Sequence, residues 1–505
     1  MRQQANLTDM FETACRWVAD RPFLVDDRSG LSGTDAASAV RQAAARLRRQ
    51  GLTPGDVVAF LCGPSSLHAV AFFAILRAGG VACALHARDT APRLEMTIAE
   101  VKPRFLIADE GHLELAHSLA ASADCVSATL LLDDVAESEV GAEEGEAHPS
   151  LPENLAAIIL SSGTTGRPKQ VLHTHVTLTA TAMMAGPVYG VLGPSDSMVV
   201  PMAPSFAAWI HTVLPLVAQR CTIVFQRRYD TDDYVQLLDD HGISIAALVP
   251  SLWRMVLPVL SRRDLPRMRV AMFSGEPGTA DLVGQLHQRA GTVRGVYLAS
   301  EGGCGCGIVA DELTLGRDGM SACAGQPVPG ADMRIVDPES DTLREISLGE
   351  TGEIALRGPS LSIGYHDDPE LTARRFQDGW WRSGDYGFID GDRMLHMRGR
   401  LDNRINSGGI KIHAEEIEAG LLQLSMVRQA AVVGVPDTQW GERVEAHLTL
   451  AGPLPCSEAE IAAAFDAATT LPRNLRPKRF HIHDALPLGP TGKLYRRALT
   501  ERTDA

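Results

Sequence analysis

The sequence lacks the features that would place it in a membrane, in a secretory pathway or on nucleic acid. It has no run of about 18 apolar residues, so we expect no membrane span. Its first residues, MRQQANLTDMFETACRW, contain no apolar core of the kind that secretory signals carry. Basic residues are in deficit, because the net charge is −15, whereas a nucleic-acid-binding protein usually presents a basic face.

Closely spaced cysteine pairs are also scarce. The nine cysteines are odd in number, and only Cys304 and Cys306 lie close together in the sequence. A single C-x-C without a second pair is a weak signal for a metal site. We therefore expect free thiols in a reducing compartment, which indicates a cytoplasmic protein.

The length and the apolar pattern predict an α/β protein with more than one domain. A chain of 505 residues is too long for a single core, and 45% of its residues are apolar. Apolar residues recur at helical spacing from Leu7 to Val18. Short buried-strand runs at 57–62 and 105–108 lie on either side of a helical run at 68–76. This βαβ pattern predicts a parallel sheet covered by helices.

The last hundred residues follow a different pattern. The expected elements are, in order, a helix over 414–422, strands over 429–435 and 444–450, and a helix over 458–468. They predict a small, separate α+β domain of ordinary size. We therefore divide the chain into a large N-terminal domain over 1–400 and a small C-terminal domain over 401–505.

One segment is unusually rich in glycine and hydroxyl groups. SSGTTGRPKQ, residues 161–170, directly follows a predicted buried strand over 156–160. Gly163 and Gly166 would let the backbone turn tightly, and Lys169 would add a positive charge. Such a loop suits a polyphosphate, although it does not match the common G-x-x-x-x-G-K-[ST] loop. From composition alone, a polar surface loop is the alternative and is favoured.

The segment S-S-G-T-T-G-x-P-K resembles the signature loop of the adenylate-forming superfamily. That family includes acyl-CoA synthetases, aryl-CoA ligases, luciferases and peptide-synthetase adenylation domains. Further segments resemble family motifs in the family's order, namely TGEIALRGPSLSIGY (351–365), WWRSGDYGFID (380–390), GRLDNRINSGGIKIHAEEIE (399–418) and PTGKLYRR (490–497). The resemblance implies a large domain of stacked mixed sheets with helices, a small mobile lid domain, and an ATP-dependent acid–thiol ligase.

The same resemblance implies which residues bind ATP. Asp385 would bind the ribose, because a carboxylate accepts two hydrogen bonds from neighbouring hydroxyls. Arg400 would lie near the ribose and phosphate, and Tyr297 would stack on adenine. The residues implied to hold the β- and γ-phosphates are Ser161, Ser162, Gly163, Thr164, Thr165, Gly166 and Lys169.

Three residues are implied to act directly in the chemistry. Ser300 would contact phosphate, and Glu301 would bind Mg²⁺, for which a carboxylate oxygen is a suitable hard ligand. Lys493 would place a cation beside the α-phosphate as negative charge builds during attack. Without the resemblance, Glu301 reads as a buried, satisfied carboxylate and Lys493 as a solvated lysine near the chain end.

The resemblance also implies a moving lid. Asp402 corresponds to the position about which the small domain rotates between two half-reactions. Gly408, Gly409 and Lys411 would then line a tunnel for the pantetheine arm of CoA. Paired glycines fit there because a thin thiol arm must pass close to the backbone.

Three positions depart from the family pattern, and all lie on the ATP side of the reaction. Gln170 replaces the glycine that usually ends the loop, Leu298 replaces a second glycine, and Ser300 replaces a threonine. We hypothesise that adenylation is slow and that the enzyme mainly converts an acyl-AMP made elsewhere into a thioester. The alternative is that Gln170 points to solvent and changes nothing.

The acid pocket is predicted from Phe206, Ala207, Trp209, Ser274, Gly275 and Gly303. Amino-acid-activating relatives usually carry an aspartate after this phenylalanine, so Ala207 argues against an amino acid. Trp209 favours an apolar acid, and the glycines around 303 favour a bulky acyl group. Fatty, aromatic and polycyclic acids are not separated by these residues.

The sequence thus predicts a ligase that joins an apolar carboxylic acid other than an amino acid to CoA, with ATP and Mg²⁺. Two other functions stay open. The thiol could be the phosphopantetheine of a carrier protein, or the chain could be a nucleotide- or acyl-adenylate-binding protein that has lost catalysis. Neither a nucleic-acid partner nor a membrane span is expected.

Overall fold

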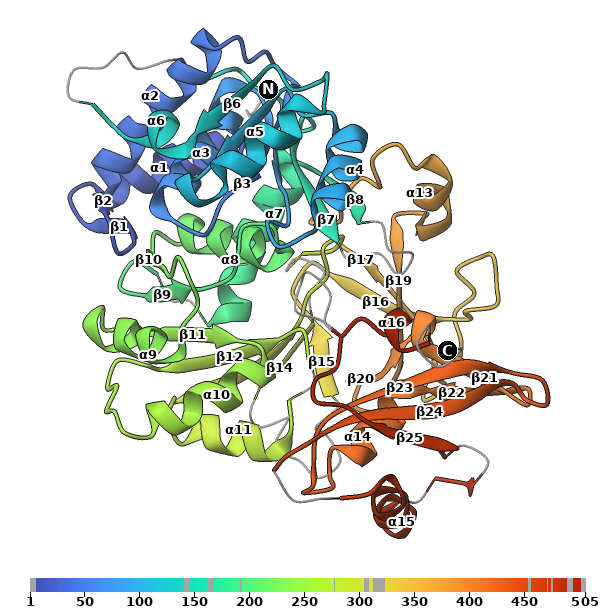
Figure 1. Cartoon of the computed structure of the whole chain (residues 1–505). Coiled ribbons are helices and arrows are strands. Elements are labelled where there is room, and N and C mark those ends of the chain that lie inside the picture. Colours follow the sequence, from blue (N-terminus) through green and yellow to red (C-terminus); the bar gives the residue numbers. More distant parts are fainter. Residues whose placement is uncertain are drawn as a thin grey trace. The chain divides into compact units, whose positions relative to one another are not determined.

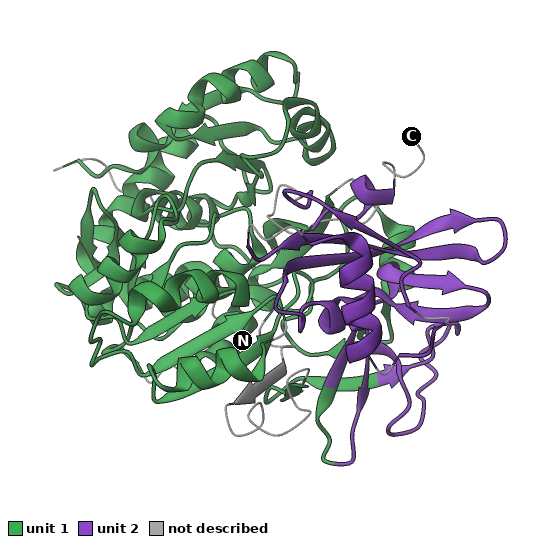
Figure 2. Cartoon of the chain, turned by 60° about the horizontal axis from the view of Figure 1, so that its bottom comes forward, with its two compact units in different colours: residues 1–334, 355–382, 392–395 green, residues 335–354, 383–391, 396–505 purple. Residues whose placement is uncertain are grey.

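The computed structural model describes residues 6–139, 146–161, 168–190, 193–276, 278–303, 308–311, 323–452, 456–469, 471–473, 476–487 and 494–500. The chain forms two compact units (Figure 2). Unit 1 consists of residues 1–334, 355–382 and 392–395, and unit 2 of residues 335–354, 383–391 and 396–505. None of the described helices has both the length and the apolar composition that a membrane span requires.

The first sheet of unit 1 has six strands in the order β6-β5-β3-β4-β7-β8. Its strands are β3 (Val57–Leu61), β4 (Val81–Ala84), β5 (Phe105–Ala108), β6 (Ala128–Leu131), β7 (Leu155–Ser161) and β8 (Lys169–Thr174). The first five are parallel, and β8 pairs antiparallel with β7 at the edge. The predicted strands over 57–62, 105–108 and 156–160 are confirmed.

Helix α3 (Ser66–Ala78) shows how the local sequence sets an element's ends. Ser65 caps the helix by accepting the backbone N–H of His68, and Gly79 ends it at φ 89°, in the left-handed region that favours glycine. Every residue but one of this helix is buried. An apolar helix of this kind belongs inside a large domain rather than on its surface.

The second sheet of unit 1 is also mixed. Its strands follow the order β15-β14-β13-β12-β11-β9-β10-β1-β2. They are β1 (Pro22–Val25), β2 (Gly30–Ser32), β9 (Ser197–Val200), β10 (Thr222–Phe225), β11 (Ile245–Leu248), β12 (Val270–Ser274), β13 (Thr292–Tyr297), β14 (Ile308–Asp311) and β15 (Cys323–Pro327). Within this order, the neighbouring strands from β13 through β12, β11, β9 and β10 to β1 are parallel to one another. Strands β2, β14 and β15 run antiparallel to their neighbours.

The core of unit 1 lies between these sheets. Helix α8 (Ala207–Ala218) packs on α7 (His175–Tyr189) and contacts β7 of the first sheet and β9 and β10 of the second (Figure 1). The other helices of this unit are α1 (Leu7–Val18), α2 (Gly33–Arg49), α4 (Ala91–Val101), α5 (Leu113–Ala121), α6 (Leu132–Ala136), α9 (Thr231–Asp240), α10 (Pro250–Leu260), α11 (Ala280–His287) and α13 (Pro369–Arg375). The predicted stack of mixed sheets with helices is confirmed.

Unit 2 contains the small α+β domain expected near the C-terminus. Its sheet runs β22-β21-β24-β23, with β25 beside β24. Its elements are η3 (Leu401–Asn403), β21 (Arg404–Ser407), β22 (Ile410–His413), α14 (Ala414–Leu421), β23 (Val427–Asp437), β24 (Gly441–Leu450), α15 (Glu458–Ala468), β25 (Arg479–Ile482) and α16 (Arg497–Thr500). All four elements predicted here are present, and the helix over 458–468 has the predicted bounds.

Four further strands contribute residues to both units. They are β16 (Asp332–Val336), β17 (Gly352–Arg357), β19 (Trp380–Ile389) and β20 (Leu395–Arg400), in the order β16-β17-β19-β20, with β18 (Phe376–Gln377) beside β19. Asp385 and Arg400, both predicted to bind ATP, lie on the parts of β19 and β20 that belong to unit 2.

Candidate active site

The predicted phosphate loop connects β7 to its antiparallel neighbour β8, the edge strand of the first sheet. Ser161 ends β7 and Lys169 begins β8, and the two residues are register partners. The backbone therefore returns to almost the same place after a short connection. The loop residues Ser162, Gly163, Thr164, Thr165 and Gly166 lie outside the described residues. The Lys169 ammonium lies 5.9 Å from the centre of the Tyr365 ring, within the range of a cation–π contact.

Tyr365 connects this strand end to the predicted magnesium ligand. Its hydroxyl donates a 2.9 Å hydrogen bond to Oε1 of Glu301, whose side chain is buried. Burial, and then the Glu301 carboxylate, raise the pKa of Tyr365 above its ordinary value, so the phenol keeps its proton and stays a donor.

The backbone around Ser300 and Glu301 is fixed from two sides. The Ser300 carbonyl accepts a 2.8 Å hydrogen bond from Nε2 of His173 in β8, and the Glu301 carbonyl accepts one of 2.8 Å from the N–H of Ser362. Burial lowers the pKa of His173 to about 4, so its ring is neutral at pH 7. With the Nε2 proton given to Ser300, Nδ1 can accept from the Thr177 hydroxyl at 3.1 Å.

Tyr365 was not among the predicted site residues, although it is the last residue of the motif segment 351–365. Strand β8 makes further contacts with that segment: Val171 bridges to Tyr365, and Leu172 exchanges two backbone hydrogen bonds of 3.0 Å with Gly364 and Ile363. The sequence signal was therefore present, but only the fold places this tyrosine between Lys169 and Glu301.

Gln170 faces a helix rather than the side of Lys169. Successive side chains of a strand point to opposite faces, and the Gln170 amide donates a 2.6 Å hydrogen bond to Glu100 of α4. Gln170 is only 7% exposed, so it does not point to solvent. Its Oε1 is buried and accepts no hydrogen bond from the described residues. The alternative that Gln170 points to solvent is therefore wrong, and the loop residues that it was expected to crowd lie outside the described residues.

This geometry bears on the effect of Gln170→Gly. The substitution would remove the hydrogen bond from Gln170 to Glu100 and introduce a flexible residue in an edge strand, which costs about 1 kcal/mol of stability. We expect the single-turnover rate of acyl-AMP formation to change by less than about threefold and the melting temperature to fall by a few degrees. Gln170→Glu, which places two carboxylates together, is the matched probe of the same contact. A large gain in adenylation by Gln170→Gly would instead support the slow-adenylation hypothesis.

Some of the residues predicted to contact adenine and the acid lie at the end of β13 or just after it. Tyr297 ends the strand half-buried, and Leu298 packs against the main core. Gly303 has φ +54°, and a Cβ at this position would lie 2.7 Å from the Thr181 hydroxyl and 2.9 Å from the His211 ring. The space beside Gly303 is thus already filled, so this glycine does not make room for a bulky acid, and Gly305 and Gly307 lie outside the described residues.

Unit 2 holds Asp385 and Arg400 as an ion pair. The Arg400 guanidinium lies 3.1 Å from Oδ1 of Asp385, which is buried. The backbone N–H of Asp385 donates to the Ser383 hydroxyl at 3.0 Å, and that of Gly384 donates to the Glu353 carboxylate at 3.0 Å. Gly384 has φ +75°, which favours glycine. These contacts fix the carboxylate of Asp385 on a rigid strand.

The predicted hinge lies just beyond this ion pair. Asp402 is exposed in the short 3-10 helix η3, with Oδ2 4.0 Å from the Arg400 guanidinium. The following residue, Asn403, donates a 2.5 Å hydrogen bond to Glu415 at the start of α14. The chain therefore passes from β20 to the small domain through one short turn in which Asp402 is exposed. The next residue, Asn403, is hydrogen-bonded to α14.

The Gly408–Gly409 turn joins β21 to β22. Both residues have positive φ, +60° and +80°, which explains a pair of glycines here. A Cβ on Gly408 would lie 2.9 Å from the indole of Trp440, and the Gly408 N–H donates to the Trp440 carbonyl at 2.7 Å. Trp440 is 44% exposed beside the turn, and sequence reasoning did not single it out.

Lys411 follows this turn and is held by an acidic residue. Its ammonium lies 2.5 Å from Oε1 of Glu339, and Arg404 donates to the same oxygen at 3.1 Å. The Lys411 hydrogen bond is the main cause that lowers the pKa of Glu339. The predicted catalytic lysine, Lys493, lies outside the described residues.

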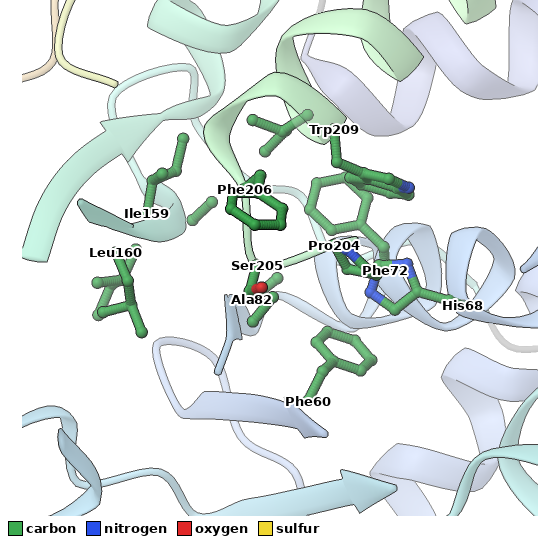
Figure 3. Close-up of a pocket in the computed structure, with 14 residues that line it drawn as sticks. Phe60, His68, Phe72, Ala82, Ile159, Leu160, Pro204, Ser205, Phe206 and Trp209 are labelled. Atoms are coloured by element: carbon green, nitrogen blue, oxygen red, sulfur yellow. The ribbon is translucent and has the colours of Figure 1, made fainter. Parts of the chain in front are cut away.

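Phe206 and Trp209 line a small cavity of about 30 Å³ in unit 1 (Figure 3). Aromatic rings surround it, those of Phe60, His68 and Phe72 among them. The other predicted pocket residues lie elsewhere: Ala207 begins α8, Ser274 ends β12, and Gly275 and Gly303 occupy turns. A volume near that of a single water molecule does not hold an acyl group.

Two polar groups stand out among the rings around this cavity. Both ring nitrogens of His68 and the indole nitrogen of Trp209 are buried without a hydrogen-bond partner among the described residues. The His68 ring packs edge-on against Phe60 and Trp209, at 4.6 Å from each ring centre. Burial lowers the pKa of His68 to about 3, so the ring is neutral.

Comparison with known proteins gives matches along nearly the whole chain. The AMP-binding enzyme family matches residues 11–366, and the AMP-binding enzyme C-terminal domain matches residues 416–493. Feruloyl-CoA synthase from Amycolatopsis sp is 29% identical over 94% of this chain and 94% of its own length. 4-Coumarate–CoA ligase 5 from Oryza sativa subsp. japonica is 30% identical over 96% of this chain and 92% of its own length.

Solved structures match as well. The ATP-bound MatB structure from Rhodopseudomonas palustris is 25% identical and covers 99% of both chains with a TM-score of 0.87. The match spans both units of this chain, so the comparison covers the strand end at Lys169, the Asp385 strand and the small domain alike.

Proposed function

The chain belongs to the AMP-binding enzyme family, and from this premise we propose how its residues divide the work of the reaction. It is an ATP-dependent acid–CoA ligase of the acyl-CoA synthetase type. A carboxylate attacks the α-phosphorus of ATP to give an acyl adenylate and pyrophosphate, and the CoA thiol then attacks the acyl carbon and releases AMP. The observation that best supports the residue roles is the Lys169–Tyr365–Glu301 arrangement at the end of the phosphate-loop strands.

In the first half-reaction, unit 1 would hold the phosphates. Ser161, Lys169 and Ser300 would bind their oxygens, together with the loop residues 162–166. Glu301 fits a magnesium ligand because its carboxylate is buried, one oxygen is oriented by Tyr365, and hard oxygen donors are what this ion prefers. Bound there, Mg²⁺ would neutralise part of the charge on the phosphates.

Unit 2 would bind the nucleoside and complete the chemistry. Asp385 would accept the ribose hydroxyls, oriented by Arg400 and by the fixed Ser383–Gly384 backbone. Tyr297, which belongs to unit 1, would stack on the adenine. We propose that residues 401–505 act as a lid that first presents Lys493 to the α-phosphate and later presents the turn at Gly408, Gly409 and Lys411 to CoA.

The residues around the Gly408–Gly409 turn of the proposed lid indicate which thiol is the substrate. The exposed Trp440 beside Gly408 offers an aromatic surface next to a turn without side chains, which suits a nucleotide-bearing thiol such as CoA. Lys411 would have to leave Glu339 to meet a phosphate of that thiol. Loading of a carrier-protein phosphopantetheine remains the second candidate, because the same arm would pass the same glycines.

The hinge makes a specific prediction. Asp402→Pro fixes φ at the turn between β20 and the small domain, so it should hinder rotation of the lid. We expect thioester formation from acyl-AMP to slow by at least about tenfold while adenylation changes less. Asp402→Ala is the matched control, because it removes the contact with Arg400 without restricting φ. Wild-type rates for both half-reactions in the proline variant would show that the lid pivots elsewhere.

We propose that the acid is apolar and aromatic, and that it carries a polar ring substituent. Phe206 and Trp209 contribute aromatic side chains to the predicted acid pocket, whereas the cavity that they line beside His68 is too small to hold the acid itself. The relatives named above for ferulate and 4-coumarate favour the same class. Ala207 leaves an ammonium group without a partner, which disfavours amino acids.

The compartment is proposed from the thiols. The described cysteines are all free, and most are buried. Burial raises the pKa of Cys83 to about 12 and that of Cys221 to about 12, so these thiols are unreactive. Cys304 and Cys306 lie outside the described residues. A reducing, cytoplasmic environment suits such a set.

One assay tests the reaction and its alternatives. Pyrophosphate release is measured with ATP, Mg²⁺ and a panel of hydroxycinnamic, benzoic, fatty and amino acids, with and without CoA. We expect release with hydroxylated aromatic acids and an acyl-CoA product when CoA is present. Thioester formation from synthetic acyl-AMP alone would favour the second-half-reaction enzyme. Product only on an added carrier protein would favour carrier loading, and binding without turnover would favour a non-catalytic adenylate-binding protein.

A further inference from the structure

A second cluster of titratable side chains lies on the sheet of unit 2 and includes none of the residues assigned above. Glu445 and His447 are two residues apart on β24, so their side chains share one face. His481 is the register partner of His447 on the parallel strand β25, which places it on the same face. One ligand atom from each of the three residues lies within 4.8 Å of the others.

The cluster is buried and leaves one nitrogen unused. Glu445 is 0% exposed and His447 is 2% exposed. Nδ1 of His447 lies 2.9 Å from Nε2 of His483, the residue that follows β25. Nε2 of His447 is buried and has no hydrogen-bond partner in the described part of the chain. When Nδ1 donates to His483, Nε2 presents a lone pair to the cluster.

We propose that Glu445, His447 and His481 bind a divalent first-row transition metal, with Zn²⁺ as the best fit. Two imidazoles and one carboxylate form the mixed nitrogen and oxygen set that Zn²⁺ accepts, with a further position open to water. Mg²⁺ and Ca²⁺ prefer oxygen ligands alone. His483 acts as the outer partner that fixes the tautomer of His447, as is usual for metal-binding histidines.

The charges around the cluster are compatible with a cation. Arg443 donates to Oε1 of Glu445 at 2.6 and 2.8 Å, but its guanidinium is also paired with Asp437 at 3.0 Å. Oε2 of Glu445 faces Nε2 of His481 at 2.8 Å. The metal would replace this hydrogen bond, with Glu445 keeping Arg443 on its other oxygen. His481 is 28% exposed at its side chain, which gives the ion a route from solvent.

The alternative is a metal-free network in which Arg443, Glu445 and His481 only stabilise β24 against β25. Two measurements on the full-length, tag-free protein, stripped of metal with a chelator, separate the possibilities. Zn²⁺ binding is measured by calorimetry in competition with a chelator of known affinity. Co²⁺ is then added, and its visible absorption bands report whether nitrogen and oxygen ligands surround it in a tetrahedral arrangement.

We expect one Zn²⁺ per chain and intense Co²⁺ bands. His447→Ala and His481→Gln should each weaken Zn²⁺ binding by at least about tenfold, and His483→Ala by about 10- to 100-fold. His481→Gln keeps a hydrogen bond to Glu445 and lies nearer the surface, so it tests the site even where His447→Ala does not fold. His287→Ala, which removes an exposed histidine of α11, is the matched control and should bind as wild type.

The proposal is overturned if the stripped protein binds no Zn²⁺, or if His447→Ala and His481→Gln bind it as tightly as wild type. If the cluster is only a metal-free network, both variants should have a lower melting temperature than wild type. Zn²⁺ should then neither bind to the protein nor raise its melting temperature. Because none of these readouts uses ligase activity, the outcome is independent of the function proposed above.

Discussion

Lys493→Ala is expected to slow acyl-AMP formation severely and to spare thioester formation from preformed acyl-AMP. In the first half-reaction negative charge builds at the α-phosphate as the carboxylate attacks, and a mobile point charge stabilises it. The second half-reaction breaks the bond to AMP after attack by a thiol, and the resemblance assigns it to another orientation of the lid. The two steps therefore depend differently on this residue.

The size of the effect follows from the loss of one charged contact in the transition state. Removal of one such donor lowers the rate by about 100- to 1,000-fold. Single-turnover rates decide the matter: acyl-AMP formation from acid and ATP, and thioester formation from synthetic acyl-AMP and CoA. Lys493→Arg keeps the charge but changes its shape and reach, so it should restore only part of the first rate.

Arg428→Ala is the matched control, because it removes an exposed cation on β23 of the same unit. It should leave both rates unchanged. Equal loss of both half-reactions in Lys493→Ala would contradict the use of two lid orientations. Wild-type adenylation in that variant would show that the cation comes from another residue.

Local patterns predicted those parts of the fold whose signal is contained in a short stretch of sequence. Helix α1 begins and ends at the predicted Leu7 and Val18, and α15 has the predicted bounds, because apolar residues recur at helical spacing. The strand over 105–108 is likewise β5, a continuous buried run between polar neighbours. The glycine break after α3 falls where Gly79 adopts positive φ.

Contacts between distant residues were not predictable in the same way. Tyr365 and Glu301 are 64 residues apart, and Gln170 and Glu100 are 70 apart. Each pair meets only because β8 lies at the edge of the first sheet, next to α4 on one side and the 363–365 segment on the other. A motif names the residue types at a site, whereas the pairing of strands decides which side chains orient them.

The cavity beside Phe206 and Trp209 is a second example of contacts that the sequence could not predict. The sequence placed both residues in an acid pocket, and they do line one cavity, but Ala207 and Gly303 do not. Ala207 begins α8 and does not line the cavity, and the space beside Gly303 is taken by Thr181 and His211. Spacing along the chain cannot show which neighbours already fill a space.

The second large effect is expected at Glu301. Glu301→Gln keeps the size of the side chain and an oxygen that can accept from Tyr365, but it removes the negative charge. A neutral amide is a poorer ligand for a hard cation than a carboxylate. We expect adenylation to slow on the order of 100-fold at a fixed, subsaturating Mg²⁺ concentration. Thioester formation from preformed acyl-AMP has no pyrophosphate leaving group, so it should change little.

The dependence on Mg²⁺ concentration separates metal binding from a structural role. If Glu301 holds the ion, the Mg²⁺ concentration at half-maximal adenylation rises in Glu301→Gln, and part of the rate returns at high Mg²⁺. A purely structural residue would lower the rate equally at all Mg²⁺ concentrations. Glu114→Gln, an exposed carboxylate on α5, is the matched control and should leave the Mg²⁺ dependence unchanged.

Tyr365→Phe tests whether the tyrosine acts through this carboxylate. The variant loses a hydrogen bond to a buried charged group, which is worth about 1.5–3 kcal/mol, or about 10- to 100-fold in rate if all of it is lost in adenylation. In the double variant Tyr365→Phe with Glu301→Gln, the two losses should not add, because the hydroxyl then has no charge to orient. Additive losses would mean that Tyr365 acts on the reaction independently, through its ring against Lys169.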